Sequence, residues 1–258
     1  MSSKQKLVRI QSSDQQATLS SNNGDFTVQL KDRNAMQSVR EIAVVEAYVP
    51  NVFYNVRSSQ GKVNNVLRYQ ETGEAVLSAT VPEGQYTIST YMVALKTAFE
   101  ATSVAQTITV TQDATTQKIT LTTSAACIFY SSADDALSTN AYVVGLQTTT
   151  ANATSSVMDS IPNLRGYSQL YLHSKTVADG NLIDGDSGAI SVAIGVSLVD
   201  APFGAMAYKQ VTTEHEGRIQ FSHPRNISNV RLVLRDSEGN KLDPGSSEIS
   251  LLFKAYLN

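Results

Sequence analysis

The stretch Val81-Pro-Glu-Gly-Gln-Tyr-Thr-Ile88 joins a strand-like segment to a helix-like one, in a chain that is otherwise rich in strands. Residues 75–81 have the pattern of a strand, and Pro82 and Gly84 then favour a turn. Residues 89–101 carry apolar side chains at spacings of three and four. That pattern predicts an amphipathic helix, with Ser89 or Thr90 as its cap.

Strand-like segments dominate the rest of the sequence. Residues 107–113 and 118–123 alternate apolar side chains with threonines on either side of a polar linker, which predicts a β-hairpin. Residues 189–199 are apolar almost throughout, which favours a central strand covered on both faces. Further strands are expected at 7–11, 26–30, 41–56, 63–69, 167–177, 217–221, 229–235 and 248–256.

A second helix is predicted over residues 134–144. Asp134 and Asp135 lie near its start, Leu137 falls on its apolar side, and Gly145 is the expected stop. Many strands with two short helices and no βαβ rhythm indicate an all-β, antiparallel sandwich or barrel.

Composition restricts the classes of function. The chain has 258 residues, a formal net charge of −3, 41% hydrophobic and 17% charged residues, and no apolar run of the length that spans a membrane. We therefore expect no membrane span and no specific nucleic-acid partner. Cys127 is the single cysteine, so an intrachain disulfide is excluded and synthesis in a reducing compartment is expected.

Residues 1–38 have little apolar surface, and a polar stretch separates their two strand-like pieces. We expect an N-terminal arm that orders by lying along a neighbouring subunit. On this interpretation, deleting the arm weakens assembly and leaves the fold intact.

Two loops carry residues that invite a chemical role. Residues 185–188, Gly-Asp-Ser-Gly, match the tetrapeptide around the nucleophile of chymotrypsin-like proteases, but the triad context is absent and a turn is favoured. The loop from Asp179 to Asp186 is acidic enough for calcium, yet Ile183 occupies a position that should carry oxygen. A solvated loop is the favoured interpretation, and ion binding there stays open. The same judgement applies to an acidic turn with Asp236, Glu238 and Asp243.

The histidines His173, His215 and His223 lie 42 and 8 residues apart, so no pair has helical metal-ligand spacing. Cys127 lies in an apolar run without a nearby histidine, which indicates a buried small side chain rather than a nucleophile. We therefore expect no catalytic residue, no metal ligand and no cofactor, and hence no enzyme.

Several segments together resemble a viral protein family. The chain resembles the penton (minor capsid) proteins of the virophage and polinton-like virus lineage over roughly residues 40–258. The segments that carry the resemblance are 81–99, 107–123, 137–145, Pro162-Asn163-Leu164, 167–174, Ala201-Pro202-Phe203-Gly204, 229–236 and Leu242-Asp243-Pro244-Gly245.

The resemblance implies a single jelly roll over residues 39–258, with an insertion at its outer end over 86–145. It implies a homopentameric plug at the icosahedral fivefold vertices of a virion, in contact with a double-jelly-roll major capsid protein, with other minor capsid proteins as further candidate partners. The main alternative is a receptor- or glycan-binding jelly-roll module, as in a spike or fibre head. A jelly-roll enzyme of the cupin type is a weaker alternative, because the histidine spacing does not suit its metal.

Overall fold

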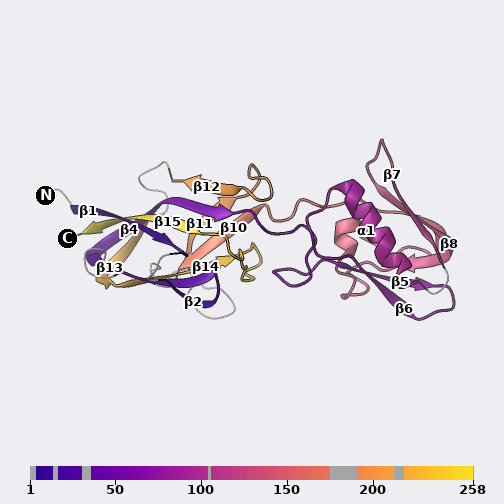
Figure 1. Ribbon diagram of the computed structural model, residues 1–258, viewed down its shortest axis with the longest axis horizontal. Helices are drawn as coiled ribbons and strands as arrows, with labels where there is room; N and C mark the ends of the chain where they lie inside the picture. Colours follow the sequence, from indigo (N-terminus) through magenta and orange to yellow (C-terminus); the bar gives the residue numbers. More distant parts are fainter. Residues whose placement is uncertain are drawn as a thin grey trace. The chain divides into compact units, whose positions relative to one another are not determined.

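The chain divides into two compact units in the computed structural model (Figure 1). The sandwich unit comprises Met1–Phe53 and Tyr167–Asn258, and the inserted unit comprises Tyr54–Gly166. The structure describes residues 4–13, 17–30, 36–103, 106–174, 191–211 and 218–257.

The sandwich unit contains two antiparallel sheets, each with five strands among the described residues. In the first sheet the order is β1 (Lys4–Gln11), β15 (Ser250–Leu257), β4 (Met36–Pro50) and β12 (Met206–Gln210), and β13 (Arg218–Ile227) also pairs with β4. In the second sheet the order is β11 (Ser191–Ser197), β10 (Gln169–Ser174), β14 (Asn229–Arg235), β3 (Asp25–Gln29) and β2 (Ala17–Asn22).

The strand pairs of this unit are nested along the sequence. β1 pairs with β15, β3 with β14, β4 with β12 and β13, and β10 with β11. A long hairpin folded over itself into two sheets gives this order, which is the jelly-roll topology. The predicted fold class, an all-β antiparallel jelly roll with two short helices, is confirmed. The first and last strands are neighbours, so the two ends of the chain lie together in Figure 1.

The core of the sandwich unit is built from alternate residues of facing strands. Val8 and Ile10 of β1 are 5% and 0% exposed, and Phe26 and Val28 of β3 are 0% and 4% exposed. They pack in one cluster with Leu232 and other residues of β14. Fully burying one such side chain contributes about 1.5–3 kcal/mol to the free energy of unfolding. β1 and β3 therefore stabilise the sandwich unit.

The N-terminal segment is therefore not an arm, which corrects the expectation for residues 1–38. Eight consecutive residues of β1 pair with β15, although the partners lie 239 to 253 residues apart in the sequence. The polar stretch before β3 contains β2, which pairs with β3 across the turn at Asn23 and Gly24. Because β1 and β3 contribute to the sandwich core, deletion of this segment is expected to disrupt the fold.

β11 also differs from expectation. It lies at one end of its sheet order, next to β10 alone among the described strands, and is not a central strand. Its apolar side chains Val196 and Ile194 still enter the sandwich core.

The inserted unit has a sheet of its own with α1 (Ile88–Glu100) packed on it (Figure 1). Its strands are β5 (Val66–Glu71), β6 (Val76–Thr80), β7 (Ile108–Gln112), β8 (Ile119–Phe129) and β9 (Ala153–Val157), in the order β6-β5-β8-β7, with β9 also paired to β8. The core includes Tyr69 and Phe99, whose rings lie 4.3 Å apart. The unit is wider than the insertion expected over residues 86–145, because β5 and β6 complete the sheet that β8 begins.

The first helix begins one residue earlier than predicted, at Ile88, and its cap is Thr87 rather than Ser89 or Thr90. Thr87 Oγ1 accepts the backbone N–H of Thr90 at 3.3 Å, and Thr90 Oγ1 accepts that of Thr87 at 3.0 Å. Two threonines thus form a reciprocal capping box in place of the usual threonine and glutamate.

The second helix is much shorter than predicted, since α2 covers only Ala141–Val144. The side chains of Asp134 and Asp135 hold turns instead, and Leu137 is 65% exposed rather than on a buried face. Gly145 does stop the helix, with φ of 93° in the left-handed region.

Candidate functional site

The two histidines that the structure describes do not form a metal centre. His173 lies on β10 and His223 on β13, which belong to different sheets. His215 and the loop from Asp179 to Ser187 lie outside the described residues. Within the described ranges there is no group of three or more histidine, cysteine or acidic side chains that could hold a metal ion.

Cys127 is a buried core residue on β8, as predicted. Its thiol donates to Oε1 of Gln106 at 3.2 Å, and burial raises its pKa. A thiol with a raised pKa stays protonated at neutral pH, so this position does not supply a nucleophile.

The carboxylates of the acidic turn after β14 accept hydrogen bonds from the backbone of the same turn. Oδ1 of Asp236 accepts the N–H groups of Glu238 and Asn240, both at 2.9 Å. Oδ1 of Asp243 accepts the N–H of Gly245 at 2.9 Å. These carboxylates therefore stabilise the turn, as Asx motifs do.

The stretch at residues 81–88 is hydrogen-bonded to residues 55 and 56, near the start of the inserted unit. Gly84 exchanges backbone hydrogen bonds with Val56, at 3.0 and 3.2 Å. Asn55, which is 2% exposed, donates from Nδ2 to the carbonyls of Tyr86 and Leu164 and accepts the N–H of Tyr86. One side chain thus joins the first, middle and last segments of the unit.

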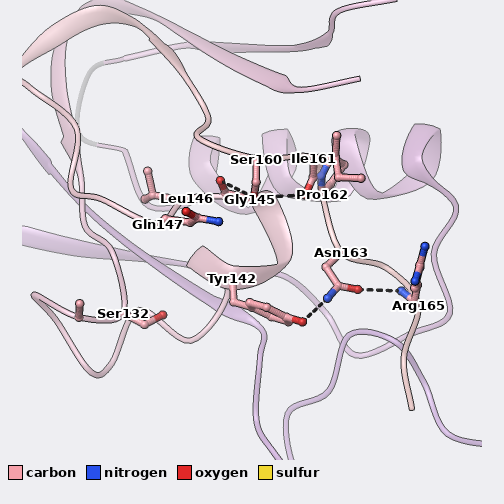
Figure 2. A pocket seen from close by; sticks show the side chains of 11 residues that line it. Ser132, Tyr142, Gly145, Leu146, Gln147, Ser160, Ile161, Pro162, Asn163 and Arg165 are labelled. Atoms are coloured by element: carbon pink, nitrogen blue, oxygen red, sulfur yellow. Dashed lines mark hydrogen bonds between the residues drawn. The ribbon is translucent and has the colours of Figure 1, made fainter. Parts of the chain in front are cut away.

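A cavity of about 560 Å³ opens on the inserted unit beside α2 (Figure 2). We call it the α2 cleft. Its polar lining includes Ser132, Tyr142, Gln147, Asn163 and Arg165, and Leu146, Ile161 and Pro162 contribute apolar surface. Its size lies in the range of small-molecule sites, and its lining has the usual mixture of apolar surface and a few polar groups.

The wall of the α2 cleft is fixed by backbone contacts. Gly145 is the residue that lets two segments meet, because a Cβ there would collide with the carbonyl oxygen of Ser160. The N–H of Ser160 donates to Gly145 O at 2.9 Å, and the N–H of Asn163 donates to Val143 O at 2.8 Å. Residues 160–163 are therefore held against α2.

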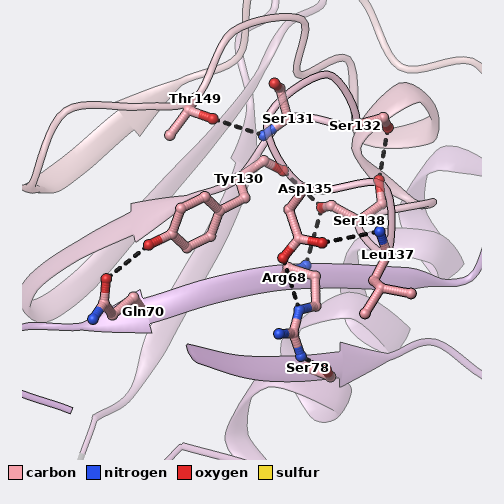
Figure 3. Close-up of polar contacts among 10 residues, drawn as sticks. All are labelled: Arg68, Gln70, Ser78, Tyr130, Ser131, Ser132, Asp135, Leu137, Ser138 and Thr149. Carbon is pink, nitrogen blue, oxygen red and sulfur yellow. Dashed lines mark hydrogen bonds and ion pairs between the residues drawn. The ribbon is translucent and has the colours of Figure 1, made fainter. Parts of the chain in front are cut away.

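A polar cluster fixes the loop on the other side of the cleft (Figure 3). Arg68 on β5 donates from Nε to Oδ2 of Asp135 at 3.0 Å and from Nη1 to Oγ of Ser78 at 2.7 Å. Its hydrogen bond lowers the pKa of Asp135. Ser138 Oγ accepts the N–H of Arg68 and donates to Tyr130 O, so the loop that carries Ser132 is anchored to the sheet.

The sandwich unit has an exposed apolar surface of a different kind. Val199, Phe203, Met206 and Tyr208 are 75%, 43%, 48% and 47% exposed, and all lie within ten residues around the start of β12. We call them the β12 surface. Tyr208 packs on Tyr48 of β4 with ring centroids 4.7 Å apart, so this side chain is held against the sheet. β12 is at the end of the sheet order in the part of the chain described.

No helix among the described residues is long and apolar enough to cross a membrane. The α2 cleft and the β12 surface are two candidate contact sites on the described surface. Neither feature was predicted from the sequence. Pro162-Asn163-Leu164, which contributes to the cleft, and Ala201-Pro202-Phe203-Gly204, which contributes to the β12 surface, were noted only for their resemblance to penton proteins.

Comparison with known proteins finds this arrangement in a viral capsid protein. The crystal structure of the mavirus penton protein is similar with a TM-score of 0.53, and the match covers 98% of this chain and 99% of that chain. The two sequences are 9% identical, so the likeness is one of fold. The match is long enough to include both units. No family model and no curated protein sequence matches the chain.

Proposed function

We propose that this chain is a structural virion protein that forms the pentameric plug at the fivefold vertices of an icosahedral capsid. The observation that carries the proposal is the nested jelly roll with its inserted unit, which matches a penton protein over nearly the whole of both chains. The resemblance of the sequence motifs to penton proteins supports the same role. The plug would contact a double-jelly-roll major capsid protein, and no catalytic role is proposed.

The β12 surface is our candidate for one side of the contact between subunits. A ring closes through two different faces of each subunit, and the core of such an interface is depleted of charged side chains. Four exposed apolar side chains near a strand at the end of the described sheet order suit such a face, with Asp200 and Lys209 beside them in the sequence. In the proposed ring, the occupant of this surface is a second copy of the chain.

The mass of the purified chain tests the ring. One subunit is 27.8 kDa, so the pentamer is expected at about 139 kDa by light scattering. Met206→Lys places a charge in the proposed contact and is expected to shift the mass to that of the monomer. Leu137→Lys, at a residue of the inserted unit that is 65% exposed, is the matched control and should leave the pentamer intact.

One result would count against the pentamer, and another would count only against the β12 surface. A trimer of about 83 kDa would favour a spike or fibre head. A pentamer that survives Met206→Lys would move the contact to another face and remove the β12 surface from it.

A further inference from the structure

The α2 cleft of the inserted unit contains a charged side chain, Arg165, that plays no part in the proposed contact between subunits. Arg165 is exposed, and its guanidinium has no partner among the described side chains. It is also the single charged residue in the lining of the cleft. It is thus the one cationic group of the lining, and the neighbouring carboxylate of Asp159 is engaged by the N–H groups of Gln147 and Thr148, at 2.7 and 2.9 Å.

Polar groups beside Arg165 are held in place before any ligand arrives. Asn163 donates from Nδ2 to the hydroxyl oxygen of Tyr142 and accepts the backbone N–H of Arg165 with Oδ1 at 3.3 Å. Figure 2 shows Tyr142, Asn163 and Arg165 in a row along one side of the cleft. The tyrosine hydroxyl already accepts a hydrogen bond, so its own proton is directed to another acceptor.

The rest of the lining offers exposed apolar surface and groups that donate and accept. The side chains of Tyr142 and Ile161 are 63% and 58% exposed. The amide of Gln147 and the hydroxyl of Ser132 can each donate and accept hydrogen bonds. A ligand that fits has a negative group, several hydroxyl or amide groups, and a face of C–H groups that packs on the tyrosine ring.

We propose that the α2 cleft binds a saccharide that carries a carboxylate, with Arg165 as its anchor. The guanidinium fork matches the geometry of a carboxylate, and the Tyr142 ring provides the surface for the sugar ring. An acetamido group would place its methyl against Ile161 and Pro162. An extended acidic peptide suits the cleft less well, because the lining offers no unpaired strand backbone to align it.

The proposal is independent of the pentamer. The cleft lies wholly within the inserted unit, whereas the candidate subunit contact lies on β12 of the sandwich unit. Loss of sugar binding and loss of the ring can therefore be told apart in one set of variants by measuring ligand binding and mass together.

Ligand-observed NMR on the full chain tests the site, with 3′-sialyllactose, lactose, glucuronic acid and a hexaglutamate peptide as probes. We expect sialyllactose to bind, glucuronic acid to bind more weakly, and lactose and the peptide not to bind. Arg165→Ala should weaken sialyllactose binding by roughly tenfold or more, which is the usual effect of losing a charged hydrogen bond. Tyr142→Ala should abolish binding, while Tyr142→Phe should keep part of it.

Arg40→Ala is the matched control, because Arg40 is exposed on β4 outside the cleft. It should leave sugar binding unchanged, and all the variants should keep the mass and melting temperature of the unaltered chain. Four results would overturn the proposal: no binding of any sugar at millimolar ligand, equal binding of lactose, preference for the acidic peptide, or unchanged binding by Arg165→Ala.

Discussion

Asn55 is the residue whose replacement tests most sharply how the inserted unit is closed. Its side chain makes three hydrogen bonds of 2.8 to 2.9 Å, two to Tyr86 and one to Leu164, and it is 2% exposed. Each such bond contributes about 1 kcal/mol net, so Asn55→Ala should lower the free energy of unfolding of the inserted unit by about 3 kcal/mol. Asn55→Asp should cost at least as much, because a carboxylate would face two carbonyl oxygens.

Urea unfolding of the full chain gives the magnitude, and hydrogen exchange gives the location. Protection should fall in peptides of the inserted unit, including α1, and persist in β4, β14 and β15 of the sandwich unit. Asn152→Ala is the control, since Asn152 is exposed and makes a single side-chain contact of 3.1 Å to Thr72. Its effect should stay below about 0.5 kcal/mol. A loss of less than 1 kcal/mol for Asn55→Ala, or loss of protection in the sandwich strands, would refute the reasoning.

Three further predictions concern other parts of the fold. Removing residues 1–11 takes away β1, and the truncated chain should show no cooperative unfolding transition of the sandwich unit in calorimetry. An unchanged transition would instead support the interpretation of this segment as an arm. Asp25→Asn removes a 1% exposed carboxylate that pairs with Arg231 and Lys241, both at 2.8 Å, and should cost about 2–3 kcal/mol in urea; a loss below about 0.5 kcal/mol would contradict this.

The third of these is acid sensitivity of the inserted unit. Backbone hydrogen bonds from Thr148 lower the pKa of Asp159, and Arg68 lowers that of Asp135. A depressed folded-state pKa stabilises the fold above the unfolded value of about 4 and loses this effect as pH falls through the folded value. The melting temperature should therefore drop below about pH 4, and Asp159→Asn should flatten the drop.

The sequence predicted those elements whose side chains alternate strongly. β14 has the bounds expected for it, because Val230, Leu232 and Leu234 alternate with residues of the other face. β9 and β12 were missed, since Ala-Thr-Ser-Ser-Val and Met-Ala-Tyr-Lys-Gln carry little periodic hydrophobicity. Their strand structure depends on pairing with β8 and β4 more than on their own composition.

Long-range pairing explains the larger errors. Nothing within residues 1–38 indicates that β1 will find β15 at the other end of the chain. In the same way, turns replace most of the predicted helix at 134–144, where Asp135 bonds to Arg68, which lies 67 residues earlier. Local propensity is a weak guide where a distant partner supplies the hydrogen bonds.

The α2 cleft could be anticipated only in part. Gly145 was recognised as a helix stop, but its second role, close approach to Ser160, depends on a contact 15 residues away. Tyr142 and Arg165 are brought together by the bond between Asn163 and the tyrosine hydroxyl. The sequence signal for the cleft was the run Pro162-Asn163 with Arg165 two residues later, and this pattern by itself does not indicate a binding site.

A reconstruction of virus particles that contain this chain tests the central claim most directly. We predict density for five copies of the jelly roll around each icosahedral fivefold axis, with the neighbouring positions filled by the major capsid protein. Density for the chain on threefold or quasi-sixfold positions, or as trimers projecting from the shell, would contradict the account.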